Sequence, residues 1–371
     1  MKIKSIFSTK NTVSEAMADL QQQYRSEFGE QQASFVIFFS TSNFDPIEVS
    51  GRMKEIFVEA EIAGCTTAGE LVSGQMLKNS IVAMVFDKEA VSTVAVAVVE
   101  GLKDGINVQK IAASFEEKFG SLKELDLEKH AGIILIDGMS GAEERVMEKI
   151  GDLTDITFVG GAAGDDGKFE KTFVFADGKT YTDAAVLVLM KVEHGFDVIK
   201  TQSFRDSGKS MIATKVDEDN REVIEFDNRP ATEVYAEKVN TSVENASQEF
   251  MSHPVGLIIN AEPYVRSPQK TIGTDIKFYC NVKQGANLSI LDPTDIIKET
   301  AEAIEKKIAE LGGISALLNF HCILRTLELE KEGRTEEYGK IFSNIPTVGF
   351  STYGEEYIGH VNQTSTMLVF K

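Results

Sequence analysis

The 371-residue sequence contains few of the residues on which several protein classes depend. It has no tryptophan, three cysteines and five histidines. Three cysteines are too few for a disulfide framework and suit a reducing compartment. No apolar stretch is long enough to span a membrane, and the N-terminal residues resemble a strand rather than the apolar core of a signal peptide. These absences favour a cytoplasmic protein without a membrane partner.

Basic residues are also scarce, because 38 Lys and Arg stand against 58 Asp and Glu and the net charge is −20. A protein this acidic repels nucleic acid and anionic membrane surfaces. We therefore expect neither to be a partner. The length exceeds what one hydrophobic core usually supports, which predicts two domains.

The motifs of common enzyme classes are missing as well. There is no phosphate-binding loop ending in Gly-Lys-Ser/Thr, no Gly-x-Gly-x-x-Gly, no His-Glu-x-x-His, no Cys-x-x-Cys and no Gly-x-Ser-x-Gly. The alternative is a thiol-dependent enzyme that uses Cys65 or Cys322 with His321. His321 and Cys322 are neighbours on an expected strand, so their side chains point to opposite faces. The sequence therefore predicts a protein that is not an enzyme, with Cys65 as a small buried side chain.

A turn rich in glycine and small residues occurs three times and is the most informative feature present. Residues 64–70 (GCTTAGE) reappear as residues 349–355 (GFSTYGE), and residues 160–165 (GGAAGD) are a shortened version. Each copy follows a run typical of a strand and ends in an acid. Backbone N–H groups, hydroxyls and a carboxylate at a strand end could line a polar pocket, or each copy could be an ordinary turn.

The turn belongs to a larger repeat. An amphipathic helix, a strand that is apolar on both faces, a second helix, the turn and a final strand follow one another three times. The three apolar strands are expected at residues 35–39, 132–136 and 316–320. Two copies cover residues 2–190 and a third covers about 287–371. This order predicts an α/β protein of repeated β-α-β-α-β-β units that form mixed sheets covered by helices.

Residues 194–286 interrupt the repeats and are mostly strand-like, with one helix expected at 229–239. This insertion is a natural boundary between two domains. The chain has no linker rich in Pro, Gly or Ser, so we expect the two domains to be closely packed.

The third repeat contains the strongest candidate site. Ligands of α/β proteins bind outside the carboxyl ends of parallel strands, where Cys322 and Arg325 are expected. Ser351, Thr352 and Glu355 of the last turn should be their neighbours. Arg325 either binds a ligand carboxylate through its planar guanidinium group or pairs with a structural acid such as Glu355 or Glu356. The first turn offers the corresponding residues Cys65, Thr66, Thr67 and Glu70.

Many short segments, in order, resemble the FIST family. Those similar to the FIST N-terminal domain are residues 62–70, 137–140 with Glu143, 159–165 and 224–231. Those similar to the FIST C-terminal domain are residues 265–267, 282–285, 320–325, 349–355 and 362–364. One departure is Asn228, where the family usually has glycine. The resemblance implies a FIST N-like domain over residues 1–220 and a FIST C-like domain over residues 221–371.

The FIST resemblance implies a cytoplasmic sensory protein of signal transduction, including two-component regulation, that binds a small molecule such as an amino acid. Some members of the family are haem proteins that sense nitric oxide. If haem is the ligand here, His321 or His360 is the candidate iron ligand. Family members occur with histidine kinases, diguanylate cyclases and chemotaxis receptors. Because the repeats fill this sequence, we expect it to signal through a separate protein of that kind.

Overall fold

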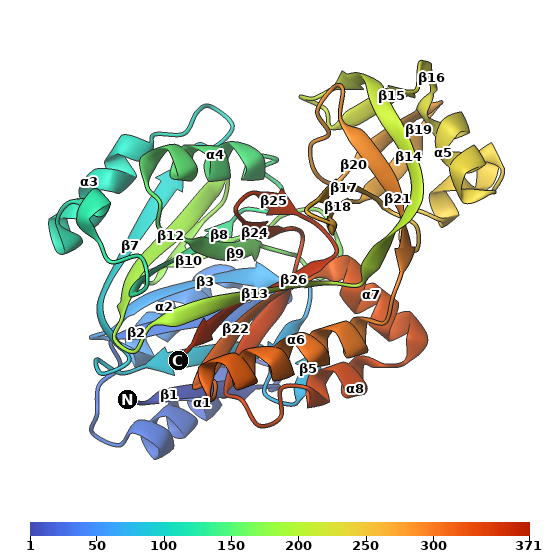
Figure 1. Ribbon diagram of the computed structural model, residues 1–371. Coiled ribbons are helices and arrows are strands. Elements are labelled where there is room, and N and C mark those ends of the chain that lie inside the picture. Colours follow the sequence, from blue (N-terminus) through green and yellow to red (C-terminus); the bar gives the residue numbers. More distant parts are fainter. The chain divides into compact units, whose positions relative to one another are not determined.

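The computed structural model describes residues 1–371 and has an α/β fold with mixed sheets, as predicted (Figure 1). It divides into two compact units. Unit 1 comprises residues 1–200, 301–359 and 365–371, and unit 2 comprises residues 201–300 and 360–364. The third repeat belongs to unit 1, because it shares its sheets with the first two repeats, and the FIST N-like and FIST C-like bounds stay a prediction.

Repeat 1 follows the predicted order of elements. The Thr12 side chain caps the first helix by accepting a hydrogen bond from the N–H of Glu15, and Gly29 ends that helix with φ 60°. Strand β2 is buried along its whole length, as its apolar sequence predicts. The elements are β1 (Ile3–Ser8), α1 (Val13–Phe28), β2 (Phe35–Thr41), α2 (Pro46–Ile56), β3 (Glu61–Thr67), β4 (Glu70–Val72), β5 (Gln75–Leu77) and β6 (Ile81–Phe86).

Repeat 2 has the same order, with a longer loop between its turn and the following hairpin. A short 3₁₀ helix at Leu122–Glu124 follows its first helix. The elements are β7 (Val91–Glu100), α3 (Val108–Phe119), β8 (His130–Ile136), α4 (Glu143–Leu153), β9 (Phe158–Ala162), β10 (Val174–Ala176), β11 (Lys179–Tyr181) and β12 (Ala184–Val192).

Repeat 3 differs from the prediction in two places. Its edge strand is β13 rather than residues 287–291, which belong to unit 2, and a helix starts directly after its buried strand. The elements are β13 (Phe196–Gln202), α6 (Ile296–Leu311), β22 (Ala316–Cys322), α7 (Ile323–Glu332), α8 (Thr335–Lys340), β23 (Thr347–Thr352), β24 (Glu355–Tyr357), β25 (His360–Val361) and β26 (Thr364–Phe370).

The three repeats exchange their short hairpins in a closed cycle. Sheet 1 has the order β1-β6-β2-β3-β10-β11, so it ends in the hairpin of repeat 2. Sheet 2 contains β7-β12-β8-β9 and is extended by β24 of repeat 3. Sheet 3 has the order β13-β26-β22-β23-β4-β5 and ends in the hairpin of repeat 1. Figure 1 shows one such junction, where red β24 lies beside green β9.

One glycine in each turn is required by this architecture. It lies where the turn strand runs parallel to the buried strand of its own repeat. A Cβ atom there would lie 1.8–2.3 Å from a carbonyl oxygen of the neighbouring strand, closer than any side chain allows. The three pairs are Gly64 with Phe38, Gly160 with Ile134 and Gly349 with Asn319. The pairs also define which residues of the repeats are equivalent.

The two faces of each sheet have different surroundings. Inner faces from all three repeats meet in one central apolar cluster that includes Phe39, Leu135 and Phe320. The outer faces of sheets 1 and 2 pack against their own helices, with Phe38 and Ile134 as examples. Alternation along a strand therefore sends successive residues either to the shared core or to the layer under the helices.

Unit 2 is built around antiparallel strands with the order β18-β17-β21-β14-β15-β20-β19. Its apolar core includes Tyr235 and Phe226. The helix that the sequence predicts here is α5, and a 3₁₀ helix spans Val243–Gln248. The elements are β14 (Phe204–Asp217), β15 (Glu222–Phe226), β16 (Arg229–Pro230), α5 (Ala231–Val239), β17 (Val255–Ile259), β18 (Glu262–Arg266), β19 (Pro268–Ile272), β20 (Asp275–Phe278) and β21 (Asn287–Pro293).

Candidate functional site

The three glycine turns meet in a ring of backbone hydrogen bonds within unit 1. Equivalent N–H groups of each turn donate to equivalent carbonyl oxygens of the next turn. These bonds run from Ala68 to Ser351 (3.1 Å), from Gly164 to Thr66 (2.9 Å) and from Tyr353 to Ala162 (3.1 Å). The turns are therefore one shared architectural element.

Most acids of the ring are bound by groups of the protein itself. The carboxylate of Glu70 accepts hydrogen bonds from the Thr67 hydroxyl, from the Ser80 N–H (3.1 Å) and from the Ser80 hydroxyl (2.6 Å). Burial raises the pKa of Glu70 to about 7, although the bonds from Ser80 and Thr67 oppose this shift. In the third turn, the Thr352 hydroxyl donates to Glu355 at 2.5 Å. Both pairs hold their turns in shape.

The second turn is rich in glycine, like many phosphate-binding turns, but Asp165 makes it unsuited to phosphate. Its carboxylate accepts from the Tyr353 hydroxyl and from three successive backbone N–H groups, at 2.6–2.9 Å. Burial acts to raise its pKa, but these hydrogen bonds outweigh burial and the pKa is lowered. The N–H groups that an anion would need are already used by this acid.

Cys65 is fully buried in the central apolar cluster. Burial, with a smaller contribution from the charge of Glu70, raises the pKa of its thiol well above the usual value. A raised pKa disfavours the thiolate, which is the nucleophilic form. Cys65 thus has the surroundings of a core residue, and the neighbouring Thr66 hydroxyl bonds the backbone of Phe173.

The structure brings the predicted residues of the third repeat together. Strands β22 and β23 run side by side, with His321 opposite Ser351 and Cys322 opposite Thr352. Helix α7 packs on both strands, and the Thr326 hydroxyl lies 2.7 Å from the Ser351 hydroxyl. Sequence reasoning missed this helix, although Gly333 marks its end with φ 69°. Arg325, on the first turn of α7, is fully buried.

A chain of hydrogen bonds lies beneath α7 and α8 on the outer face of sheet 3. The Ser365 hydroxyl donates to Asn319 Oδ1 at 2.7 Å. Asn319 Nδ2 donates to the Tyr338 hydroxyl at 3.4 Å, and that oxygen lies 3.0 Å from His321 Nδ1. All four side chains are fully buried. Sequence reasoning named His321 but not the other three, since no motif connects them.

The same layer is less polar in repeat 1 and apolar in repeat 2. Pairing of the strands places Phe38, Ser40, Thr66 and Ile81 of repeat 1 where repeat 3 has Asn319, His321, Ser351 and Ser365. Repeat 2 has Ile134, Ile136, Ala162 and Ala185 at these positions. The repeat thus folds without the polar layer, which is a special property of repeat 3. We define the polar layer as Asn319, His321, Ser351 and Ser365 with Thr326 and Tyr338.

The electrostatics of this layer are set by burial and by Arg325. Burial first, and then the charge of Arg325, lower the pKa of His321 well below its usual value, so the imidazole is neutral. Burial also raises the pKa of Glu328 on α7, which the charge of Arg325 opposes. His321 Nε2 has no hydrogen-bond partner.

The surroundings of His321 do not fit a haem ligand. A haem would need an imidazole that faces a large apolar pocket. His321 instead lies among polar side chains, and its Nδ1 and ring contact Tyr338, with ring centroids 4.7 Å apart. His360 lies in unit 2 and is buried. No group of three His, Cys, Asp or Glu side chains is placed to hold a metal ion.

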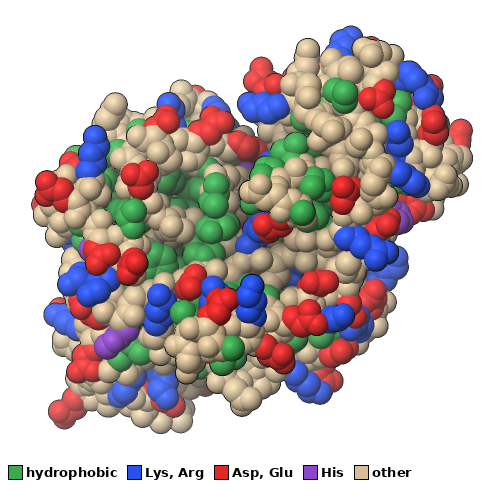
Figure 2. All heavy atoms as spheres, viewed as in Figure 1, with side chains coloured by type: hydrophobic (Ala, Val, Ile, Leu, Met, Phe, Trp, Pro, Cys, Tyr) green, Lys and Arg blue, Asp and Glu red, His purple; other side chains and the backbone are tan.

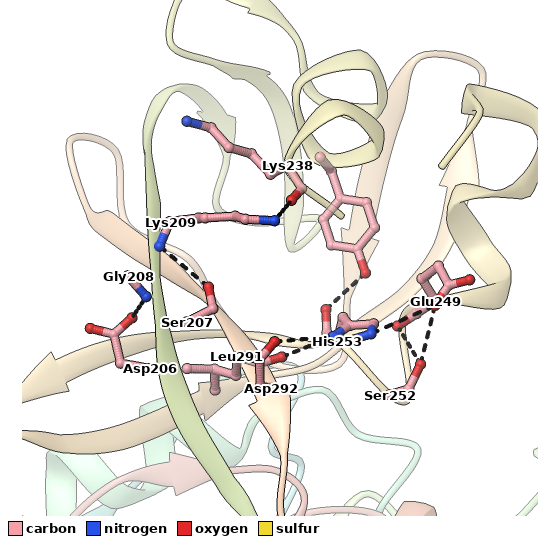
Figure 3. A network of polar contacts seen from close by, with 11 residues as sticks. Asp206, Ser207, Gly208, Lys209, Lys238, Glu249, Ser252, His253, Leu291 and Asp292 are labelled. Atoms are coloured by element: carbon pink, nitrogen blue, oxygen red, sulfur yellow. Dashed lines mark hydrogen bonds and ion pairs between the residues drawn. The ribbon is translucent and has the colours of Figure 1, made fainter. Parts of the chain in front are cut away.

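A second polar network lies in unit 2 around His253 (Figure 3). His253 Nδ1 lies 3.3 Å from the Leu291 carbonyl oxygen and 3.7 Å from Asp292, and Nε2 lies 3.9 Å from Glu249. The Tyr235 hydroxyl donates to the backbone oxygen of His253 at 2.8 Å. Both ring nitrogens have acceptors nearby and the side chain is partly exposed, so this network is a typical surface cluster of polar groups.

Comparison with known protein families gives matches to two domains that together cover most of the chain. The model of the FIST N domain matches residues 34–229 and that of the FIST C domain matches residues 231–357. The chain belongs to the FIST family. FIST domains are sensory domains of signal transduction that bind small ligands. The FIST N match ends within unit 2, and the FIST C match includes the polar layer except Ser365.

A protein of Methanocaldococcus jannaschii described as uncharacterised is similar to this FIST protein, with 22% identity over 296 residues. The match covers 74% of this chain and 57% of that protein, so the chain spans less than two thirds of the relative's length. No helix of the chain combines the length and the apolar character that crossing a membrane would require. On the face shown in Figure 2, acidic and basic side chains are interspersed rather than separated by sign.

Proposed function

We propose that this FIST protein is a cytoplasmic sensor that binds a small molecule, such as an amino acid, at the strand ends of repeat 3, beside its polar layer. The observation that carries the proposal is the contrast among repeats: the layer is apolar in repeat 2 and polar in repeat 3. Buried polar groups reduce stability unless they are paired, so a fold that does not need them retains them for another reason. Ligand recognition is that reason.

The proposed contacts come from two adjacent strand ends. Arg325 would bind the ligand carboxylate, since its guanidinium group can donate two parallel hydrogen bonds. Cys322 would line the site, and Ser351, Thr352 and Glu355 would receive the ammonium or a hydroxyl group. The corresponding first-turn residues (Cys65, Thr66, Thr67, Glu70) would maintain the ring, because Thr66 bonds the backbone of Phe173, Glu70 also accepts from Ser80, and Cys65 lies in the apolar cluster.

Binding would be reported to a separate signalling protein, such as a histidine kinase or a diguanylate cyclase. No turnover is expected, since both thiols at the turns and strand ends are buried. A substrate that the purified protein converts steadily, with activity abolished by Cys65→Ala or Cys322→Ala, would contradict this function.

The test is calorimetric titration of the purified protein with each of the common L-amino acids. For an amino acid that binds, Arg325→Ala should weaken binding by roughly tenfold or more, because a charge-assisted hydrogen bond contributes about 1.5–3 kcal/mol. The matched control is Arg52→Ala, whose side chain is 46% exposed on α2. Equal affinities of Arg325→Ala and the wild type would place the site elsewhere.

A further inference from the structure

The hydrogen bonds of the polar layer have one consistent direction. Asn319 Oδ1 can only accept, and it accepts from Ser365 at 2.7 Å. Asn319 Nδ2 can only donate, and it donates to Tyr338. The Tyr338 hydroxyl has one proton, which can go to His321 Nδ1 at 3.0 Å or to Ser365 at 3.5 Å. The shorter distance favours His321.

This direction determines the tautomer of His321. If Tyr338 donates to Nδ1, then Nδ1 is unprotonated and the single proton of the neutral imidazole is on Nε2. Nε2–H is therefore a buried donor at the end of a chain of four side chains. No acceptor for it exists in the protein. A buried donor without an acceptor is unfavourable by about 1–3 kcal/mol, so a partner is required.

Two further observations concern the partner. The equivalent positions carry Ser40 and Ile136, so the fold does not require an imidazole there. Arg325 lies on the first turn of α7, directly after the strand that carries His321, and is fully buried, so its positive charge acts on the ring and contributes, after burial, to the lowered pKa of His321. Fixed positive charge beside an N–H donor favours an anionic oxygen over a neutral one.

We propose that His321 Nε2–H donates a hydrogen bond to an anionic oxygen of the ligand, such as one oxygen of a carboxylate. The proposal rests on the proposed sensory function and specifies which atom of this site recognises the ligand. His321 is neutral and acts as a donor, while Arg325 supplies the charge. The layer thus selects ligands that carry an acid group.

Access to Nε2 requires a movement of the covering elements, since the atom is buried. Helix α7 covers β22 and β23, and the six-residue α8 carries Tyr338 and packs on β5. Binding of the acid group would therefore be coupled to the position of α7 or α8. This coupling gives the site a mechanical output, which a sensor needs.

The test is nitrogen NMR of the full chain with ¹⁵N-labelled histidine. With five histidines, the His321 signals can be assigned from their loss in His321→Gln. Protonated and unprotonated ring nitrogens have well-separated shifts, so the spectrum identifies the tautomer. In the wild type we expect the ring proton on Nε2. In Tyr338→Phe, which lacks the hydroxyl that bonds Nδ1, the proton should no longer be restricted to Nε2 and both tautomers should be populated. A wild-type spectrum with the proton on Nδ1 would overturn the proposal. This outcome can be read from the wild type alone, so it does not depend on whether Tyr338→Phe folds.

The ligand part is tested with sodium acetate as the probe, against sodium chloride at the same ionic strength. Acetate should shift the NMR signals of Nε2 and of its proton. His321→Leu should weaken acetate binding by roughly tenfold. His321→Gln keeps an N–H donor and should therefore lose about threefold or less in affinity. Methylammonium chloride should shift neither. An Nε2–H signal that acetate leaves unchanged indicates a bound water as the partner and overturns the acid-group proposal.

The two proposals fail in different ways. An Nδ1–H tautomer with intact amino-acid binding would reject the role of His321 but keep the sensor. The expected tautomer without binding of acetate or any amino acid would reject the sensor function at this layer.

Discussion

Repeats 2 and 3 of unit 1 share a backbone plan but differ in what lies under their helices. Both have a buried strand, a glycine pressed against it and a turn in the same ring. Repeat 2 fills the covered layer with Ile134 and Ile136, and repeat 3 places Asn319 and His321 there. The comparison separates residues that the fold requires in every repeat from residues that the fold does not require. The glycines belong to the first class and the polar layer to the second.

The largest expected effect tests the shared plan. Gly160→Ala would place Cβ 1.8 Å from the Ile134 carbonyl oxygen, so the strands must separate and we expect a loss of about 4 kcal/mol or more in the free energy of unfolding. Gly151→Ala is the control, because Gly151 lies in α4 with no atom within 4 Å of a new Cβ, and should be neutral or stabilising. Urea unfolding measures both. Equal stabilities would refute the architectural role.

The next effect concerns the acid of the first turn, whose equivalent in repeat 2 is Val174. The pKa of Glu70 rises from 4.5 in the unfolded chain to about 7, so its burial is favourable only when protonated. Stability should therefore fall as pH rises from 4.5 to 7, by about 3 kcal/mol. Glu70→Gln should remove this part of the pH dependence. The exposed Glu55→Gln corrects for the change in net charge, and identical pH profiles of Glu70→Gln and wild type would disprove the assignment.

A smaller effect is expected when repeat 3 is made like repeat 2. The double variant Asn319→Ile/His321→Ile should change the free energy of unfolding by about 1 kcal/mol or less, since the two members of the chain that remain, Tyr338 and Ser365, lie 3.5 Å apart and can bond each other. Ligand binding should disappear. Thermal unfolding and calorimetry measure the two properties on the same sample. A double variant that is strongly destabilised but still binds the ligand with the wild-type affinity would show that these residues serve the fold rather than ligand binding.

The smallest effect is expected for haem. Because polar side chains surround His321, His321→Ala should not change the absorption spectrum obtained when the protein is titrated with haemin. His360→Ala is measured in parallel, since its role as a haem ligand stays a prediction. A sharp Soret band in the wild type that vanishes in His321→Ala would show that this layer does accommodate haem.

The sequence predicts the long elements and the turns well for a physical reason. Helices such as α1 and α3 have a continuous apolar stripe, and strands such as β2 are apolar on both faces. The exchanged hairpins could not be predicted, because strands of two or three residues have no detectable period. Helix α7 was missed because Ile323 and Leu324 continue the apolar run of β22.

The residues of the candidate site could be brought together from the sequence only where they are local in it. Cys322 ends β22 and Arg325 follows it on α7, while Ser351 and Thr352 end the neighbouring β23, so topology alone makes them neighbours. Tyr338 and Ser365 join His321 from distant parts of the chain. Only the fold determines such contacts, and no spacing in the sequence encodes them.

The exchange of hairpins also limits how such a chain can be divided. Each sheet of unit 1 takes one edge from another repeat, so a fragment with a single repeat would have one sheet without its edge and one hairpin without a sheet. Three identical copies of that fragment could satisfy one another by passing each hairpin to the next copy. The single chain thus has the connectivity of a cyclic trimer whose three copies are joined end to end. Because the copies are joined in one chain, the residues of one repeat can differ from those of the other two.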